Sequence, residues 1–317
     1  MFEIGYTLSS EEFGPRDLVR FAQRAEETGF SFALVSDHFH PWIDAQGESP
    51  FVWSVIGGVA QATEGLRLGT GVTCPLIRIH PGLVAQAAAT SEAMMPGRFF
   101  LGVGTGENLN EHIFGDRWPP AAERQRMLEE AVACIRELWK GEETSFRGNY
   151  YTVENARIYT MPEEPPPIYA AAAAEKAAEL AGRIGDGLIS VAPNKDVVEA
   201  FQGAGGTGKP SYGQLHVCWA ESEKKARKTA LKQWPNTSIQ GESGQELPLP
   251  RHFEQLAEMV SEEDITGSVP CGPDPEWHLR AIHEYADAGF DHVYVHQIGH
   301  DQEGFFRFYE REVLPKL

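Results

Sequence analysis

The sequence predicts a (β/α)₈ barrel, and three observations indicate this fold. Short apolar runs alternate with segments of helical period along the chain and give about eight strand–helix units. The strands are nearly continuous in apolar residues, as is typical of a parallel sheet buried on both faces. The length of 317 residues suits one barrel with insertions, and no linker divides it. We therefore expect a single domain over residues 1–317, with its chemistry at the carboxyl ends of the strands.

The first half of the chain supplies four of the expected strands. They are expected at 2–8, 31–36, 66–73 and 99–103, and helices are expected at 15–28, 51–63, 81–95 and 121–140. The first helix shows its period clearly, because Leu18, Phe21 and Ala25 recur on one face. Gly29 then ends that helix.

The second half continues the pattern after an insertion. A stretch rich in Tyr, Phe and Thr, residues 144–160, predicts an inserted hairpin. Strands are expected at 167–172, 187–192, 214–219 and 291–296, and helices at 175–184, 222–233, 252–261, 275–288 and 303–312. A Gly-, Ser- and Pro-rich segment, 235–250, predicts a long loop.

Composition excludes several classes of protein. The net charge of −19 argues against a nucleic-acid surface, which needs clustered Lys and Arg. No apolar run reaches the ~18 residues of a membrane span, and the N-terminus MFEIGYTL does not resemble a signal peptide. Cys74, Cys134, Cys218 and Cys271 lie far apart without a CxxC motif. Reduced thiols in a cytoplasmic protein are therefore expected.

The segment SDHFHPW, which follows the second strand, holds two histidines. His38 and His40 are two apart, so on an extended chain they would face the same way, as in barrel hydrolases that bind metals. A metal site would need further ligands from later strand ends, and the strands at 167–172 and 187–192 offer none. We therefore predict no metal. The alternative of two polar residues at the rim stays open.

Two glycine-rich segments follow the third and fourth strands. In LGTGVTCP, Gly71 would permit a strained backbone or the close approach of a ligand, or would only mark a bulge. FLGVGTGENLNE lacks the G-x-G-x-x-G spacing of a dinucleotide fingerprint. Glu107 comes just past the strand end and is either an acid/base group or a cap of the next helix.

The fifth strand runs into a helix through a turn of small residues, AAAAEK. The first turn of a helix binds phosphate through free backbone N–H groups and the helix dipole. Close packing of alanines explains the same sequence equally well.

Taken in order, these segments resemble the luciferase-like (β/α)₈ flavin and deazaflavin oxidoreductases. Within that superfamily the sequence is most similar to the coenzyme F420-dependent group that contains the glucose-6-phosphate dehydrogenases. The matching segments are GYTLSSEEFGPRDLV, VSDHFHPW, GTGVTCP, PGRFFLGVGTGENLNE, AGRIGDG and HQIGHDQEGFFRFY. The pair SDHFHPW and GTGENLNE is the most specific part of the match.

The resemblance implies a role for each group of the active site. Asp37 would hydrogen-bond the deazaflavin, and His38 would lie near the carbon that gives up its hydride and help to remove the alcohol proton. Trp42 would line the same pocket. Glu107 would exchange a proton with the deazaflavin ring nitrogen, and Glu11 matches a further carboxylate near the site.

The resemblance also implies the contacts that hold the cofactor. Gly71 and Val72 fall where the family carries a non-prolyl cis peptide behind the ring. Ring and tail contacts match Cys74, Thr105, Gly106 and Asn110, and the phosphate-binding turn matches Ala173, Ala174, Lys176 and Ala177. Relatives have glycines in that turn, and Lys176 could add a charge contact to the phosphate or the anionic tail.

The match fails at the expected substrate phosphate. Relatives that act on sugar phosphates hold the phosphate with Lys and Arg, whereas the corresponding loop here offers Val191, Asn194 and Lys195. The insertion QGESGQELPLP has no Lys, and Gly267 stands at the expected Arg position, although Arg251 lies nearby. Because a phosphate dianion needs cationic partners, we expect a neutral alcohol or carbonyl substrate instead.

Several alternatives remain at the level of the sequence. The chain could be an F420-dependent glucose-6-phosphate dehydrogenase, an FMN-dependent monooxygenase of the same fold, or a ligand-binding relative without activity. The presence of both His38 and Glu107 argues against the last. The resemblance also suggests a homodimer.

Overall fold

Eight parallel strands close into a barrel in the computed structural model, which describes residues 2–239 and 241–317. The order around the barrel is β1–β10–β9–β8–β7–β4–β3–β2. The strands are β1 (Glu3–Leu8), β2 (Phe32–Val35), β3 (Arg67–Thr70), β4 (Phe99–Val103), β7 (Ile168–Ala171), β8 (Gly187–Ser190), β9 (Ser211–Val217) and β10 (His292–Gln297). The predicted (β/α)₈ barrel is therefore confirmed.

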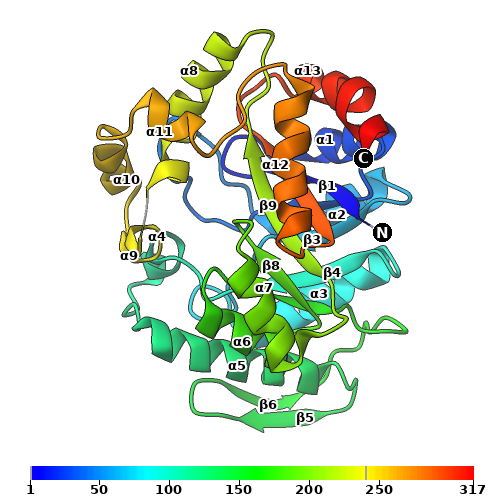
Figure 1. The fold of residues 1–317 in the computed structure, drawn as a ribbon. Coiled ribbons are helices and arrows are strands. Elements are labelled where there is room, and N and C mark those ends of the chain that lie inside the picture. The colour runs from blue at the N-terminus through cyan, green and yellow to red at the C-terminus, as the bar shows by residue number, and fades with distance from the viewer. Residues whose placement is uncertain (1, 240) are drawn as a thin grey trace.

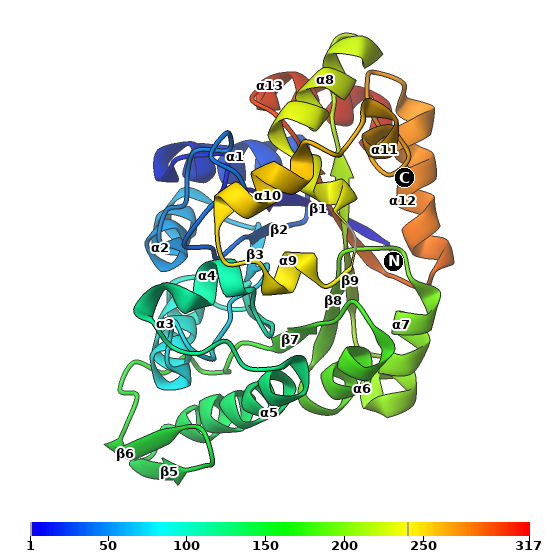
Figure 2. The ribbon, with the colours of Figure 1, turned by 90° about the vertical axis from the view of Figure 1, so that its left-hand side faces the viewer.

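Helices surround this barrel (Figures 1 and 2). The longer ones are α1 (Pro15–Thr28), α2 (Val52–Ala62), α3 (Pro81–Met94), α5 (Ala121–Leu138), α6 (Glu175–Ile184), α7 (Lys195–Phe201), α8 (Glu223–Gln233), α12 (Pro275–Asp287) and α13 (Gln302–Phe308). None of the described helices is both long and apolar enough to cross a membrane.

Helix α1 illustrates how the sequence sets the helix boundaries. Pro15 begins it, where its missing N–H is no loss. Leu18, Phe21 and Ala25 are buried against the strands, as their spacing predicts. Gly29 ends the helix with φ 103°, a left-handed conformation that favours glycine.

A cluster of large side chains fills the inside of the barrel. It consists of Phe32, Leu34, Phe100, Ile189, Tyr212 and Tyr294. Alternate residues of a strand share a face, so the residues two and four positions beyond these also point inward. This register directs side chains at the carboxyl ends of the strands into the mouth of the barrel.

The predicted hairpin is present and lies outside the barrel. β5 (Thr144–Arg147) pairs antiparallel with β6 (Thr152–Ala156), on the far side of α5 from the barrel (Figure 1). The carboxylate of Glu130 on α5 accepts backbone N–H groups from Asn149, Tyr150 and Tyr151, at 2.7–2.8 Å. This carboxylate fastens the hairpin to the helix.

The second insertion differs from its prediction. The expected loop 235–250 contains a 3₁₀ turn at Pro235–Ser238 and the short helix α9 (Ser243–Glu246); Gln240 lies outside the described residues. The expected helix 252–261 is α10 (Pro250–Ala257), and α11 (Glu262–Thr266) follows behind a capping box of Ser261 and Asp264.

Helix α9 is held in place by side chains from two other helices. Buried Arg124 of α5 donates to Glu246 Oε1 at 3.0 Å and to Gln245 Oε1 at 2.9 Å. Asn108, the first residue of α4 (Asn108–Glu111), donates to the carbonyl of Glu246 at 2.9 Å. Figure 2 shows α4, α9 and α10 together in front of the barrel.

Candidate active site

His38 lies between two carboxylates just past the end of β2. Its Nδ1 is 3.0 Å from Oε1 of Glu11, although the angle of this contact is not that of a hydrogen bond. Its Nε2 is 4.0 Å from Oε2 of Glu107. Glu11 follows β1 and Glu107 follows β4, so the carboxyl ends of three strands bring these groups together.

Glu11 is fixed by two hydroxyl groups, one that follows β1 and one that follows β2. Its Oε2 accepts from Ser9 Oγ at 3.0 Å and from Ser36 Oγ at 2.8 Å, and the carboxylate is buried. A buried carboxylate that accepts two hydrogen bonds is held in one orientation. Glu11 therefore presents its remaining oxygen to His38.

Glu107 precedes α4 and stays half-exposed. Glu107 occupies the N-cap position of α4, but its side chain makes no capping hydrogen bond. Its Oε2 accepts a 3.3 Å bond from Nδ2 of Asn110, and the side chain is 30% exposed. The carboxylate is thus positioned yet open to a ligand.

Asn110 joins the loops after β2 and β4. Its Oδ1 accepts backbone N–H groups from Phe39 at 2.9 Å and from His40 at 3.1 Å. The ring of His40 turns away to the carbonyl of Leu109, with Nδ1 at 2.9 Å. The two histidines of SDHFHPW therefore have different contacts: His38 faces Glu11 and Glu107, and His40 faces Leu109.

Among the described residues, no group of three or more His, Cys, Asp or Glu side chains could hold a metal ion.

Asp37 belongs to a buried ion-pair network that the sequence analysis missed. Its Oδ1 accepts from Arg78 Nη2 and its Oδ2 from Thr73 Oγ1, both at 2.8 Å. Arg78 also pairs with Glu111, through its backbone N–H at 2.8 Å and its Nε at 3.3 Å. The signal was an arginine inside the apolar run PLIRI, since a buried charge needs a partner.

Burial and charge act against each other in this network. Burial lowers the pKa of Arg78, but Asp37 and Glu111 outweigh it and hold that pKa above its ordinary value. Burial raises the pKa of the Glu111 carboxyl, and the ion pair with Arg78 offsets this only in part. One guanidinium thus serves two carboxylates, and its charge is balanced inside this network.

Trp42 forms an aromatic wall beside His38. The two ring centroids are 5.3 Å apart with an edge-on geometry, and Trp42 meets Phe253 of α10 edge-on at 5.1 Å. Trp42 therefore links the barrel mouth to the second insertion.

The glycine segment after β3 packs against the barrel interior. The peptide bond between Gly71 and Val72 is cis, as the resemblance implied. A side chain at Gly71 would crowd Leu34, and one at Gly104 would meet Val72. These close approaches explain why glycine occupies both positions.

Gly106 and Thr105 form the turn between β4 and α4, beside Cys74. Gly106 has φ 72°, and an added Cβ would lie 2.6 Å from Sγ of Cys74. Burial, with the charges of Glu111 and Glu107, raises the pKa of the Cys74 thiol, which keeps it protonated. Thr105 is half-buried next to this contact.

Gly106→Ala should destabilise the protein more than Gly97→Ala does. Gly97 has a similar φ of 74°, but open space surrounds it. Alanine at either position pays roughly 1–2 kcal/mol for the left-handed backbone. At Gly106, overpacking against Cys74 adds about 1–3 kcal/mol. Urea unfolding of both variants measures the difference, and equal losses would contradict the close packing of this turn.

The first turn of α6 leaves backbone N–H groups free at the surface. Ala174 precedes the helix without a side-chain cap, and the N–H groups of residues 175–177 bond to no other described residue. Ala173, Ala174 and Lys176 are exposed, and Ala177 is half-buried. The turn can therefore receive an anion. The structure shows no direct contact between it and His38.

The predicted substrate residues lie on the exposed loop after β8. The Asn194 side chain caps α7, accepting from Asp196 N at 3.0 Å, and Lys195 pairs with Glu199 at 3.3 Å. Val191 is 54% exposed. This loop thus offers an apolar side chain and a lysine that is already paired.

Comparison with known proteins identifies the family. Residues 1–292 match the luciferase-like monooxygenase family. An F420-dependent glucose-6-phosphate dehydrogenase of Microbacterium testaceum (strain StLB037) is 38% identical, over 99% of this chain and 96% of that one. The enzyme of the same name from Amycolatopsis mediterranei (strain U-32) is 36% identical, over 100% and 99%.

A solved structure agrees with these relatives. An F420-dependent secondary alcohol dehydrogenase in complex with an F420-acetone adduct superposes with a TM-score of 0.91 at 30% identity, covering 99% of this chain and 98% of that one. The F420-dependent tetrahydromethanopterin reductase of Methanopyrus kandleri, at 20% identity and a TM-score of 0.81, shares the fold. The chain belongs to the luciferase-like family, in the branch that contains the F420-dependent glucose-6-phosphate dehydrogenases.

Proposed function

We propose that this protein transfers a hydride between coenzyme F420 and a small neutral alcohol or its carbonyl counterpart. Its dependence on F420 follows from relatives of 36–38% identity and from the structure at 30% identity, all named for that cofactor. The observation that carries the proposal is the position of His38, between buried Glu11 at 3.0 Å and half-exposed Glu107 at 4.0 Å.

The residues present fit F420. Gly71 and Gly106, where the resemblance implies cofactor contacts, have no room for a side chain, because an added Cβ would lie 3.0 Å from Leu34 or 2.6 Å from Sγ of Cys74. The unpartnered N–H groups in the first turn of α6, which includes exposed Lys176, suit the phosphate of the tail. When bound, F420 supplies the group that accepts or gives up the hydride.

His38 and Glu107 would handle the protons. A proton on Nδ1, 3.0 Å from the Glu11 carboxylate, would leave a lone pair on Nε2, where His38 would accept the alcohol proton. Glu107, the more exposed of the two carboxylates, would exchange the proton of the deazaflavin ring nitrogen. Trp42 excludes water from one side of His38.

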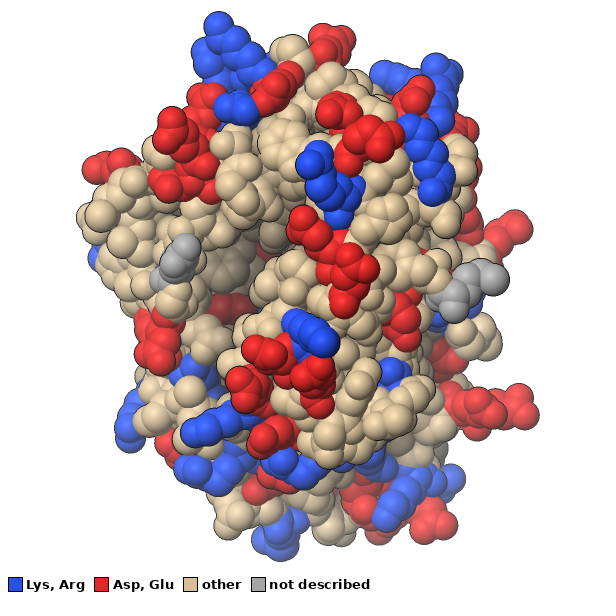
Figure 3. Space-filling model, in the orientation of Figure 1, with Lys and Arg blue, Asp and Glu red and all other residues tan. Residues whose placement is uncertain are grey.

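The charge of the mouth favours a neutral substrate. Arg78 forms ion pairs with Asp37 and Glu111, and Lys195 forms an exposed ion pair with Glu199. Figure 3 shows a hollow beside the α9–α11 insertion with acidic side chains within and around it. A phosphate dianion would meet mostly negative charge there.

The second candidate is a sugar-phosphate substrate. It is favoured by the names of the curated relatives, which are glucose-6-phosphate dehydrogenases. Arg251, exposed at the start of α10, is the cation that could serve it.

Two measurements test these proposals. Fluorescence titration with F420, FMN and FAD should give tight binding of F420 alone. Tight binding of FMN without F420 would overturn the cofactor. Neutral secondary alcohols and glucose 6-phosphate are then compared by the loss of F420 absorbance. Turnover of glucose 6-phosphate at low concentration, and of no neutral alcohol, would establish the second candidate.

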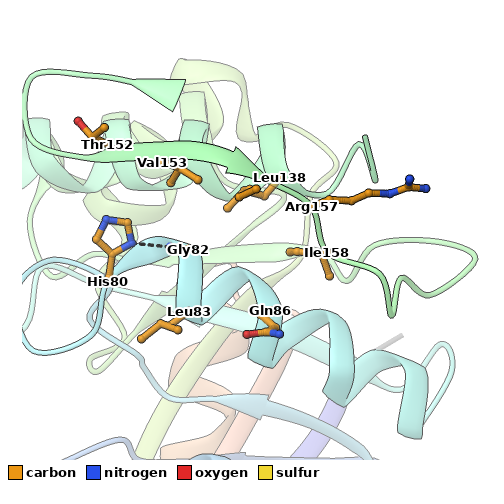
Figure 4. A pocket seen from close by; sticks show the side chains of 10 residues that line it. His80, Gly82, Leu83, Gln86, Leu138, Thr152, Val153, Arg157 and Ile158 are labelled. Carbon is orange, nitrogen blue, oxygen red and sulfur yellow. Dashed lines mark hydrogen bonds between the residues drawn. The ribbon is translucent and has the colours of Figure 1, made fainter. Parts of the chain in front are cut away.

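The outer face of α2 and α3 would be the interface of a homodimer. Leu83 is 61% and Met94 38% exposed, and Leu83 lies between two shallow cavities of about 300 Å³ each. Figure 4 shows the first, between α3, α5 and β6, which none of the predicted site residues line. A second copy would cover this apolar face.

Leu83→Glu should convert the dimer to a monomer. A charge there would be desolvated in the interface. Light scattering after size exclusion should give twice 35.1 kDa for the wild type and 35.1 kDa for the variant. A monomeric wild type would contradict the proposal, and Met259→Glu, at an exposed position that lines neither cavity, serves as control.

A further inference from the structure

A second histidine system lies at the mouth of the barrel, built from β9, β10 and the turn after β1. Nδ1 of His216 is 2.8 Å from Nδ1 of His296, and Nε2 of His296 is 3.1 Å from Oε2 of Glu12. Glu12 also accepts the backbone N–H of Gly299 at 3.1 Å. Glu12 and His296 are buried, whereas His216 is half-buried. The two histidines are register partners on adjacent strands.

Both rings point into the barrel. Tyr212 lies four residues before His216 and Tyr294 two before His296, and both tyrosines belong to the interior cluster. Because alternate residues share a face, the histidines lie one layer further toward the mouth. His38 reaches the same mouth from β2, and β1 and β10 separate β2 from β9. The two histidine systems therefore approach from different sides.

Adjacent carboxylates support the two systems. Glu11 contacts His38, and the next residue, Glu12, holds His296. Each histidine also packs edge-on against a tryptophan. The ring centroids of Trp42 and His38 are 5.3 Å apart, and those of Trp234 and His296 are 4.5 Å apart. Trp42 packs against the apolar cluster that contains Trp234. One aromatic wall thus borders both systems.

The proton positions follow from the short contacts. Two Nδ1 atoms 2.8 Å apart need one proton between them, and Glu12 requires a proton on Nε2 of His296. When both imidazole rings are neutral, His216 therefore carries its proton on Nδ1 and has a lone pair on Nε2. Burial and the His296 ring lower the pKa of His216 to about 3, consistent with a neutral ring.

The outer ring nitrogen of His216, Nε2, lacks a hydrogen-bond partner among the described residues. Nε2 of His216 makes no hydrogen bond to another described residue and is not among the fully buried atoms. Nε1 of Trp234 and Oγ1 of Thr7 are buried without hydrogen-bond partners among the described residues. Thr7 continues the β1 register to the level of His296. Buried polar groups are nearly always bonded, so this cluster calls for a polar ligand group.

We propose that His216, Trp234 and Thr7 form an oxygen subsite that binds a hydroxyl of the substrate other than the one that reacts. His296 and Glu12 are positioning residues that fix the proton of His216. The preferred substrates are then small vicinal diols or hydroxycarbonyl compounds rather than simple alcohols. This inference rests on the proposed function for the reacting hydroxyl at His38.

The test compares butan-2-ol with butane-2,3-diol, which differ by one hydroxyl. The wild type should favour the diol in kcat/KM by ~2- to 10-fold, since one hydrogen bond to the extra hydroxyl is at stake. His216→Phe should remove that preference, because it raises KM of the diol by a larger factor than KM of butan-2-ol. His216→Gln, which keeps a polar end, should retain part of it, and His296→Asn should act like a weaker His216→Phe. Exposed His283→Gln is the control.

Other outcomes overturn the subsite. Equal losses for both alcohols would place His216 at the reacting oxygen or in the fold, and an unchanged preference would show that it does not touch substrate. The melting temperature of each variant, compared with that of the wild type, shows whether a loss of activity comes from a loss of folding. If neither alcohol reduces F420, the proposed function fails. The subsite is then tested without cofactor by the ¹⁵N ring signals of labelled histidine, assigned with His216→Gln. A shift of the His216 signal with the diol but not with butan-2-ol would support it, and no shift would overturn it.

Discussion

Arg78→Met is expected to lower the free energy of unfolding by about 3–5 kcal/mol, because it leaves buried carboxylates without their cation. Asp37 and Glu111 both lose their pairing, and their side chains are each only 1% exposed. Asp37 should then reorient or take up a proton, which would weaken F420 binding as well. Urea unfolding and F420 titration of the same variant measure the two effects.

A double variant and a surface variant serve as controls. Arg78→Met with Glu111→Gln removes one of the orphaned charges and should recover part of the lost stability. Arg147→Met breaks the exposed pair with Glu154 and should change stability little. A loss at Arg78 no larger than at Arg147 would refute the role of the buried network.

Removing either proton-handling group should slow turnover strongly while F420 still binds. We expect His38→Ala and Glu107→Gln each to reduce kcat by ~10²–10⁴-fold, the range typical of a general acid or base. Neither substitution deletes a contact with the α6 turn, so the dissociation constant of F420 should stay near that of the wild type. Single-turnover F420 absorbance separates the chemical step from binding.

His40→Ala is the matched control for His38→Ala. The His40 ring bonds to the carbonyl of Leu109 and takes no part in the contacts of His38. Its loss should leave kcat close to wild type. Near-normal turnover in His38→Ala, or an equal loss in His40→Ala, would remove His38 from the proposed chemistry.

Much of the barrel was predictable because its signals are local. The 3.6-residue period of α1 and the glycine after it depend on neighbouring residues only. Where local signals conflict, the predicted boundary was wrong. β9 begins at Ser211 and not at residue 214, because Ser211 and Gly213 are not typical strand residues although they are buried in the strand. The capping box at Ser261 and Asp264 was a readable signal for α11 that was overlooked.

The site was predictable in part, through resemblance rather than through spacing. Glu11, His38 and Glu107 meet as that resemblance implied, but no local pattern indicates it. The pairing of His216 with His296 spans 80 residues and depends on the register of two strands. Arg78 is missed for a similar reason, because its partners Asp37 and Glu111 lie 41 and 33 residues away.

The turn after β1 has an evolutionary consequence. Glu11 and Glu12 are neighbours in the chain, yet each supports a different histidine on a different side of the mouth. In the proposed subsite, substitutions at Glu12, His216 or His296 would alter which molecules are accepted while the Glu11–His38 contact stays as it is. Substrate range and the chemistry at His38 would then be separable during evolution.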